Sequence, residues 1–509
     1  MSTVLLLALT VSVITYIAWA RLSRHRVRLP PGPSRLPFVG SVHHLPLEYQ
    51  HKKFVELAKT FGDVIFLQLF SRPTVVLNSL DAASDLLEKR SSKYSDRPRF
   101  ILTAMMGFDL AMSIMPYGEQ WRRHRRWFAA AFVDKKLESY VPIQQRETHR
   151  LLVGLLESPD AFLALIKRYV GALMMEVAYG HEVTSLDDEI VVLAEKAVGA
   201  ATEAGSPAAT LIDFVPILQW IPAWLPGGRW KMRAAEVRQM VRRTSDVPFA
   251  RVQAAIAAGT ARPCFLWSLL EEEGETSEEE LEEIKAAANL VYGAGTDTTA
   301  TVLNAFVLAM VLHPDACKKA QEEIDRVIGD ARLPDFGDRA SLPYVEALFK
   351  EVYRWIPPVP LGLPHRLTED DSYRCYTIPE GSMMIPNVWG MTRNADIYLD
   401  PETFRPERFL EMDAATAAAA DPRNMAFGFG RRICPGKEFA DGSVWLAAAN
   451  VLAAFDIRKA RDAAGREVTP VPAFASGMIS HVRPFACDIR PRSLKAARMI
   501  GQLQVDGGA

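Results

Sequence analysis

The 509-residue sequence is poor in cysteine, and its charges nearly cancel. Its 5 cysteines are odd in number and spread from Cys264 to Cys487, which argues against the disulfide framework of small secreted proteins. None forms a C-x-x-C pair, so a structural zinc site is not expected. With 59 Lys and Arg against 61 Asp and Glu, the net charge of −2 gives no support to nucleic-acid binding.

The sequence also lacks strand–helix–strand repetition with a glycine-rich phosphate loop, so no dinucleotide-binding domain is expected. Hydrophobic residues make up 49% and charged residues 24%, which is typical of a folded protein and excludes a disordered chain or a polytopic membrane protein. No linker is evident after residue 40. We therefore expect one large folded body over residues 41–509.

The N-terminus has the pattern of a membrane anchor. Residues 1–20 carry no charged side chain, and 20 residues at helical rise reach about 30 Å, the thickness of a bilayer core. Arginines follow at positions 21, 24, 26 and 28, which favours a cytosolic location for the rest of the chain. A signal peptide is the alternative, because Ala18-Trp19-Ala20 fits a cleavage site, but such a peptide carries its positive charge before the apolar run. We predict a transmembrane anchor over residues 1–20 and, because Pro30, Pro31 and Pro33 stiffen the chain, a basic, proline-rich hinge over 21–40.

The body is predicted to be mainly helical with a few strands. Residues 64–70 and 74–77 have the pattern of a hairpin, and residues 376–378 and 383–385 have the pattern of a second one, turning at 379–381. The capping box of Ser277 and Glu280 begins a helix whose apolar pattern continues to Leu312, about 53 Å at helical rise. We expect this helix to be buried at the centre of the fold.

The middle of that helix contains Gly293-Ala294-Gly295-Thr296-Asp297-Thr298-Thr299, which are poor helix formers for a core. One interpretation is a kink, with threonines hydrogen-bonded back to the preceding turn. The other is a local opening where a small ligand lies beside an acid and a hydroxyl. The residues alone leave both open.

A cysteine near the C-terminus stands in an unusual setting. The segment Phe427-Gly428-Phe429-Gly430-Arg431-Arg432-Ile433-Cys434-Pro435-Gly436 places two glycines before Cys434 and Pro-Gly after it. Backbone N–H groups in such a loop can point at the sulfur and stabilise a thiolate. Because a buried structural cysteine would need neither the glycines nor the arginines, we interpret Cys434 as a metal ligand or a nucleophile.

This segment reproduces the complete FxxGxRxCxG signature of the cytochrome P450 superfamily of haem-thiolate monooxygenases, which the chain resembles. Further motifs of that family occur at 121–125 (W-x-x-x-R), 294–299 (A-G-T-D-T-T), 351–354 (E-x-x-R) and 406–409 (P-E-R-F). The resemblance covers essentially the whole chain and is to the microsomal eukaryotic class. It implies a mainly α fold with small β-sheets (α+β), in which the long central helix lies over the haem.

The resemblance also implies roles for single residues. Cys434 is similar to the axial thiolate ligand of haem b, and Asp297 and Thr298 resemble the acid–alcohol pair that passes protons to bound O2. Ala294 and Gly295 would leave room for O2. Further residues similar to the family's cofactor-binding set are Trp121, Arg125, His365, Phe427, Gly430, Arg432 and Gly436, of which Trp121, Arg125, His365 and Arg432 would hold the propionates. Glu351, Arg354 and Arg408 resemble the buried charge triad of the family.

The implied partners are a lipophilic small-molecule substrate, O2, NADPH-cytochrome P450 reductase and, as a second electron donor, cytochrome b5. The basic residues Arg122, Arg126, Arg431 and Lys437 could form a docking face for an acidic partner. Apolar residues at 211–225 suit contact with a membrane surface: Ile212, Phe214, Ile217, Leu218, Trp220, Ile221, Trp224 and Leu225. The expected location is the endoplasmic reticulum membrane, with a single span and a cytosolic catalytic domain.

The motif wording and His365, where arginine is commoner, resemble fungal members that act on secondary metabolites such as terpenoids or polyketides. Two alternatives remain: a haem-thiolate isomerase or dehydratase that acts on peroxides without a reductase, and a non-catalytic haem-binding protein. The Asp297–Thr298 pair argues against both, because neither needs a complete proton relay.

Overall fold

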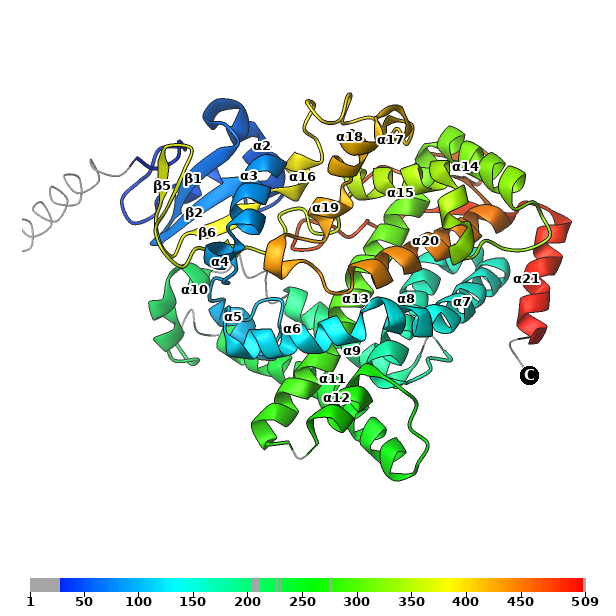
Figure 1. The fold of residues 1–509 in the computed structure, drawn as a ribbon, viewed down its shortest axis with the longest axis horizontal. Coiled ribbons are helices and arrows are strands. Elements are labelled where there is room, and N and C mark those ends of the chain that lie inside the picture. Colours follow the sequence, from blue (N-terminus) through cyan, green and yellow to red (C-terminus); the bar gives the residue numbers. More distant parts are fainter. Residues whose placement is uncertain are drawn as a thin grey trace, which may run out of the picture.

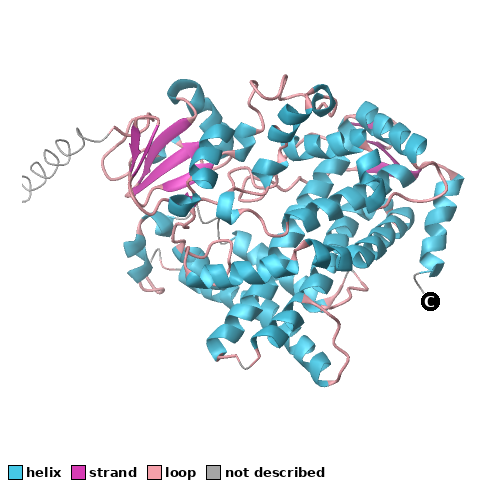
Figure 2. Cartoon of the chain, in the orientation of Figure 1, coloured by secondary structure: helices cyan, strands magenta, loops and turns pink. Residues whose placement is uncertain are grey.

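The computed structural model describes residues 28–185, 187–203, 211–225, 228, 230–274 and 276–506. The anchor predicted over residues 1–20 lies outside the described residues, as does the beginning of the hinge. Helices make up most of the described chain, and strands gather mainly at one side of the molecule (Figures 1 and 2). This arrangement agrees with the expected mainly α fold with small sheets.

The helices are of very different lengths, and the short ones flank the sheets and the loops. Their bounds are η1 Val42–His44, α2 Gln50–Phe61, α3 Leu80–Ala83, η2 Ser84–Lys89, α4 Ser91–Tyr94, α5 Ile101–Thr103, η3 Ala104–Phe108, α6 Glu119–Ala131, α7 Asp134–Glu157, η4 Pro159–Ala161, α8 Phe162–Tyr179, α9 Glu189–Glu203, α10 Leu211–Phe214, η5 Pro216–Trp220, α11 Trp230–Ala257, α12 Phe265–Glu273, α13 Glu278–Leu312, α14 Pro314–Val327, η6 Phe336–Ser341, α15 Pro343–Trp355, α16 Val388–Met391, α17 Arg408–Glu411, α18 Ala414–Ala419, α19 Arg423–Ala426, η7 Gly430–Arg432, α20 Lys437–Ala454 and α21 Leu494–Asp506.

The strands form three small sheets, with the orders β1-β2-β6-β3, β4-β5 and β8-β7-β9. Their bounds are β1 Val64–Leu69, β2 Arg72–Leu77, β3 His365–Arg366, β4 Asp371–Tyr373, β5 Tyr376–Ile378, β6 Met383–Pro386, β7 Phe455–Arg461, β8 Glu467–Val468 and β9 Cys487–Pro491. The predicted first hairpin is confirmed, because β1 and β2 pair antiparallel from Val64 opposite Leu77 to Leu69 opposite Arg72.

The second predicted hairpin is wrong. Both segments are strands, but β5 pairs antiparallel with β4, whereas β6 joins the other sheet between β2 and β3. The tight turn lies at Arg374 and Cys375, which both have positive φ and connect β4 to β5. All four residues of β6 are buried, so this strand gains more from a central place in the larger sheet than from pairing with β5, which is only partly buried.

The predicted central helix is confirmed as α13. Ser277 and Glu280 form the capping box, and the helix ends at Leu312 before His313 and Pro314. It packs along α8 and against α11, α15 and α20, deep in the helical part of Figure 1. It is long and apolar enough to cross a membrane, but 72% of its most apolar window is buried inside the protein, so it serves as the core helix of the fold.

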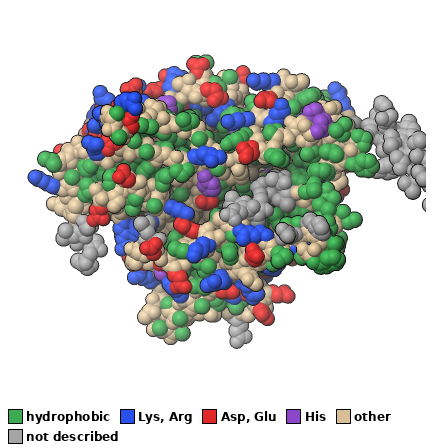
Figure 3. All heavy atoms as spheres, turned by 180° about the vertical axis from the view of Figure 1, so that it is seen from behind, with side chains coloured by type: hydrophobic (Ala, Val, Ile, Leu, Met, Phe, Trp, Pro, Cys, Tyr) green, Lys and Arg blue, Asp and Glu red, His purple; other side chains and the backbone are tan. Residues whose placement is uncertain are grey.

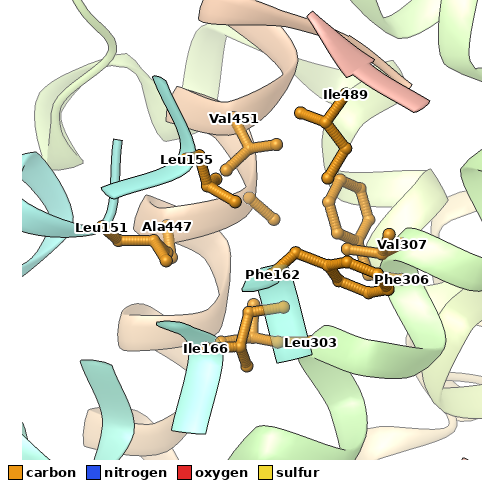
Figure 4. A pocket seen from close by; sticks show the side chains of 11 residues that line it. Leu151, Leu155, Phe162, Ile166, Leu303, Phe306, Val307, Ala447, Val451 and Ile489 are labelled. Carbon is orange, nitrogen blue, oxygen red and sulfur yellow. The ribbon is translucent and has the colours of Figure 1, made fainter. Parts of the chain in front are cut away.

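The core beside α13 is closely packed. A small hollow of about 10 Å³ remains where α7, α8, α13, α20 and β9 meet, and its lining is wholly hydrocarbon (Figure 4). Figure 4 shows Phe162 and Phe306 pointing into it, together with aliphatic side chains from the surrounding helices. A site of this size with no polar partner is too small and too apolar to hold a ligand or a stable water.

The described part of the predicted hinge is docked on the larger sheet. Pro31 O accepts a hydrogen bond from Phe66 N at 2.9 Å, and Gly40 bridges to Leu69. A Cβ at Gly32 would lie 1.9 Å from Phe66 O, so only glycine allows this approach. The segment is non-helical, as its prolines predict, and its direction relative to the sheet is fixed.

Candidate functional site

A cavity of about 270 Å³ lies between α13 and the cysteine segment. Its wall is formed by α6, α8, α13, residues 358–365 and residues 425–440. The polar groups of the wall are few and gather near the arginines and the cysteine, whereas the α13 side is mostly apolar. The structure therefore brings segments separated by more than 300 residues to one cavity.

Cys434 lies between η7 and the start of α20 and lines this cavity. The turn before it needs glycine at 430, where φ is +54° and a Cβ would lie 2.4 Å from Leu87 O. Cys434 N donates to Phe427 O at 2.8 Å, which closes the turn. Phe427, whose ring packs against Tyr353, is the first residue of the signature.

The sulfur of Cys434 experiences opposing influences. Burial raises the pKa of the thiol, while the N–H of Gly436 and the charges of Arg125 and Lys437 act to lower it. The predicted N–H group at the sulfur is thus present, but burial has the larger effect on the pKa of the thiol. Gly436 has an ordinary negative φ, and a Cβ there would meet nothing within 4 Å, so no protein neighbour requires this glycine.

Arg432 is buried beside the cavity and does not contact the sulfur. Its guanidinium donates to Ser95 O (2.7 Å), Met112 O (3.1 Å) and Met115 O (2.8 Å), and lies 4.5 Å from the Trp121 ring centroid. Burial lowers the pKa of Arg432 to about 10. Arg125 of α6 donates to Ile433 O at 2.6 Å, and burial lowers its pKa as well.

The structure adds Arg97, which the sequence did not indicate. It is buried, lines the same cavity and donates to Ser113 O (2.9 Å), Leu363 O (2.7 Å) and Pro364 O (2.8 Å). Burial lowers its pKa far below the usual value, and the charge of Arg432 adds to this effect. No local motif marks Arg97, because its importance arises only when residues 363–364 fold against it.

His365, at the start of β3, completes this group. Its Nδ1 lies 2.8 Å from Tyr94 O and donates to it, which leaves Nε2 available. Burial lowers the pKa of His365 well below the usual value, and Arg97 and Arg432 add to the effect. A buried group of cations whose hydrogen bonds all go to carbonyl oxygens is costly unless an anion lies beside it.

The α13 side of the cavity has part of each arrangement that the sequence left open. Thr296, Thr298 and Thr301 donate to the carbonyl oxygens four residues earlier, with Thr298 Oγ1 2.8 Å from Ala294 O. Nevertheless α13 is continuous from Glu278 to Leu312, and Ala294 and Thr298 line the cavity. Asp297 is not part of the cavity wall; its Oδ2 lies 3.0 Å from His481 Nε2.

Gly295 lines the cavity, and its missing side chain also leaves room for a side chain of α8. A Cβ at this position would lie 2.2 Å from Met174 Sδ, which lines the same cavity. The glycine therefore lets the Met174 thioether lie close to α13 beside the cavity.

The charge triad predicted from the E-x-x-R and P-E-R-F motifs is confirmed. Glu351 accepts two hydrogen bonds of 2.7 Å from Arg354 and one of 3.1 Å from Arg408, and all three side chains are buried. The remaining N–H groups of both arginines bind carbonyl oxygens in the loop before α17. This network holds the loop that precedes α17 against α15.

A mainly helical fold that presents one cysteine and a group of cations to a largely apolar cavity is typical of a haem-thiolate protein. The family model described as Cytochrome P450 matches residues 30–475. The chain is 49% identical to cytochrome P450 monooxygenase 176 of Postia placenta, over 93% of this chain and 92% of the relative. It is 47% identical to cytochrome P450 monooxygenase 136 of the same fungus (93% and 91%) and 41% identical to cytochrome P450 monooxygenase claR of Ampulloclitocybe clavipes (93% and 88%).

The chain therefore belongs to the cytochrome P450 superfamily, is similar to its fungal members, and is a monooxygenase. The family implies a haem with a cysteine thiolate ligand, O2, a substrate and a redox partner. The residues present fit such a cofactor, because Asp96 offsets only part of the positive charge of Arg97, Arg125 and Arg432, and because no atom of the described residues lies within 4 Å of a Cβ placed at Gly436.

Proposed function

We propose that this protein is a membrane-anchored haem-thiolate monooxygenase that inserts one oxygen atom of O2 into a lipophilic small molecule, with C–H hydroxylation as the typical reaction. Electrons would come from NADPH through a separate reductase. The observation that carries the proposal is the single cavity that Cys434, Thr298 and the arginines line together. When bound, the haem supplies O2 activation, which a thiolate ligand favours by donating electron density.

The side chains of this protein would divide the remaining work. Cys434 would be the axial ligand, and Arg97, Arg125, Arg432, Trp121 and His365 would hold the propionates. Because Nδ1 of His365 already donates to Tyr94 O, its Nε2 could bind a carboxylate only after taking up a proton. Phe427, Gly430 and Gly436 would shape the loop under the ring, while Ala294 and Gly295 would form the wall above it.

Protons would reach the site through α13. Thr298 holds its hydroxyl at the cavity wall on Ala294 O, where it can bind a water and pass on a proton. Asp297, one residue away at the edge of the helix, would supply that proton. The apolar lining from Val291, Val302 and Leu363 would exclude other water and favour an apolar substrate.

The domain organisation we propose is an anchor over residues 1–20, a hinge over 21–40 and a catalytic domain over 41–509. The exposed side chains of Ile217, Trp220 and Trp224 support a membrane-facing surface at η5 and the turn after it. In Figure 3, hydrophobic side chains gather along one edge of that view of the molecule. By contrast Ile212 and Phe214 are buried in the core and do not take part, contrary to the prediction for these two residues.

A docking face for the reductase, and for cytochrome b5, would include Arg122, Arg126, Arg431 and Lys437. Arg122, Arg126 and Arg431 are exposed near the cysteine segment, which supports this placement. Arg123, between them in sequence, is not available because Glu283 binds it. An endoplasmic reticulum location and a role in fungal secondary metabolism, for example on terpenoids or polyketides, complete the proposal.

The test uses the full chain purified with a fungal reductase. The reduced, CO-bound protein should have the spectrum of a thiolate-ligated haem, and Cys434→Ala should abolish it. Cys375→Ser is the matched control, because Cys375 is an exposed thiol in the β4–β5 turn. A spectrum of the histidine-ligated type would refute the proposal. Peroxide rearrangement without NADPH would favour an isomerase or dehydratase instead.

A further inference from the structure

A histidine outside the cavity wall is placed against the acid of α13. His481 belongs to the loop between β8 and β9, and its Nε2 lies 3.0 Å from Asp297 Oδ2. The backbone fixes this placement, because His481 O accepts from Ala475 N (2.8 Å) and Ser480 N donates to Pro358 O (2.9 Å). The contact is within ion-pairing distance.

The two ends of the His481 ring have different surroundings. Its side chain is 41% exposed, yet Nε2 itself has no access to solvent and, although it lies 3.0 Å from Asp297 Oδ2, it makes no hydrogen bond within the described part of the chain. The exposed part of the ring is therefore the part that points away from Asp297. One nitrogen is sealed against the carboxylate, while the rest of the imidazole meets water.

Asp297 has a similar intermediate position. It is 29% exposed and does not line the cavity, whereas the next residue, Thr298, does. The groups thus follow one another in the order bulk water, His481, Asp297, Thr298 and cavity. Tyr292, one turn earlier on α13, is not an alternative donor, because burial together with the charges of Glu195, Asp188 and Asp297 raises its pKa far above neutrality.

We propose that His481 is the outer member of the proton relay of this enzyme, an inference that rests on the proposed function. A protonated His481 transfers the proton on Nε2 to Asp297 Oδ2, which gives a neutral imidazole and a neutral carboxylic acid. The carboxylic acid turns toward Thr298 and gives its proton to a water molecule held by the Thr298 hydroxyl, which restores the carboxylate and leaves the proton on that water. The imidazole then takes a new proton from bulk water, so each cycle moves one proton inward.

The rival explanation is that His481 only fastens its loop to α13. Replacing His481 by glutamine separates the relay from a purely structural contact, because the glutamine amide can donate a hydrogen bond to Asp297 but cannot pass on a proton. The experiment measures NADPH oxidation by the full-length holoenzyme with a fungal reductase and no added substrate, in H2O and D2O. The variants are His481→Gln, His481→Ala and Asp297→Asn, with Arg483→Gln as the control for an exposed change in the same loop.

A relay predicts that both His481 variants oxidise NADPH about tenfold more slowly, with a larger solvent isotope effect, and that Arg483→Gln matches the wild type. Full activity in His481→Gln, with or without a loss in His481→Ala, would overturn the proposal. The CO spectrum of every variant should match the wild type, because none of these side chains lines the cavity near Cys434.

A second readout does not depend on turnover. In protein labelled with ¹³C in its histidine rings, the resonance that disappears in His481→Gln belongs to His481. This resonance should shift in Asp297→Asn and stay in place in Arg483→Gln; an unmoved resonance in Asp297→Asn would overturn the pairing. If the wild type lacks the thiolate-type spectrum, the proposed function fails, while this measurement still decides whether His481 senses Asp297.

Discussion

Two glycines in α13 form a matched pair for testing how this helix packs beside the cavity. A Cβ at Gly293 would meet no atom within 4 Å, whereas a Cβ at Gly295 would lie 2.2 Å from Met174 Sδ and 3.1 Å from its Cγ. Both residues stand in the helix interior, two positions apart. Replacement of each by alanine therefore changes helix propensity equally but packing very differently.

The expected magnitudes follow from these two contributions. Alanine is favoured over glycine inside a helix by about 0.5–1 kcal/mol, so Gly293→Ala should raise the free energy of unfolding by about that amount. Gly295→Ala has the same gain but forces Met174 aside, and overpacking of a core costs about 1–3 kcal/mol. The difference between the two variants should thus be about 1–3 kcal/mol, with Gly295→Ala less stable.

Urea unfolding followed by circular dichroism gives this difference directly, because both variants share one background. A double-mutant cycle that combines Gly295→Ala with Met174→Ala tests whether the clash causes this difference. Because the clash disappears when the thioether is absent, Gly295→Ala and Met174→Ala should show a coupling energy of about 1 kcal/mol or more. Equal stabilisation by Gly293→Ala and Gly295→Ala, or strict additivity with Met174→Ala, would refute the packing argument. Because Met174 also lines the cavity, the displaced side chain should change substrate-induced spectra as well.

Three further predictions concern buried charge. Arg97→Gln should release haem more readily than wild type in a transfer assay to apomyoglobin, because one cation of the site is lost. Arg366→Gln should not, because the exposed Arg366 side chain pairs with Asp96 and does not line the cavity. Glu351→Gln should lower the free energy of unfolding by about 3–5 kcal/mol in urea titrations, since two buried guanidinium groups lose their anion. Burial raises the pKa of Asp213 to about 6, so the folded state holds the proton on this carboxyl more tightly than the unfolded state does. The free energy of unfolding should therefore fall by at most about 3 kcal/mol as pH rises from about 4 to 6. Asp213→Asn should flatten this dependence of the free energy of unfolding on pH and be more stable than the wild type at pH 7. An unchanged pH dependence in the variant would show that it does not arise from Asp213.

The sequence predicts best those features whose geometry is local. The capping box at Ser277 and the stop at His313 define α13. The strands β1 and β2 could be predicted because they follow each other in sequence and pair directly. The E-x-x-R spacing places Glu351 and Arg354 on one helical face, so their pairing could be predicted as well. In each case the interacting groups are close in sequence or carried by one element.

Prediction fails where a residue's partner is distant in sequence. The strand β6 was assigned to a hairpin because its place between β2 and β3 depends on a segment about 300 residues earlier. Arg97 was missed because its acceptors, Leu363 and Pro364, are carbonyl oxygens that no side-chain pattern reveals. Ile212 and Phe214 have the composition of a surface that contacts lipid, yet other elements cover them.

The arginines beside the cavity also suggest how stability and cofactor binding are coupled. Arg97 and Arg432 are buried, their hydrogen bonds go to carbonyl oxygens, and each lowers the pKa of a neighbouring base in the site. Such an arrangement opposes folding, since like charges are brought together away from water and Asp96 offsets them only in part. A ligand with two carboxylates that binds only the folded chain would offset this cost through mass action. We therefore expect haem binding to raise the free energy of unfolding by more than the bond to Cys434 alone would contribute. Arg97→Gln should reduce this increase while leaving the ligation by Cys434 intact.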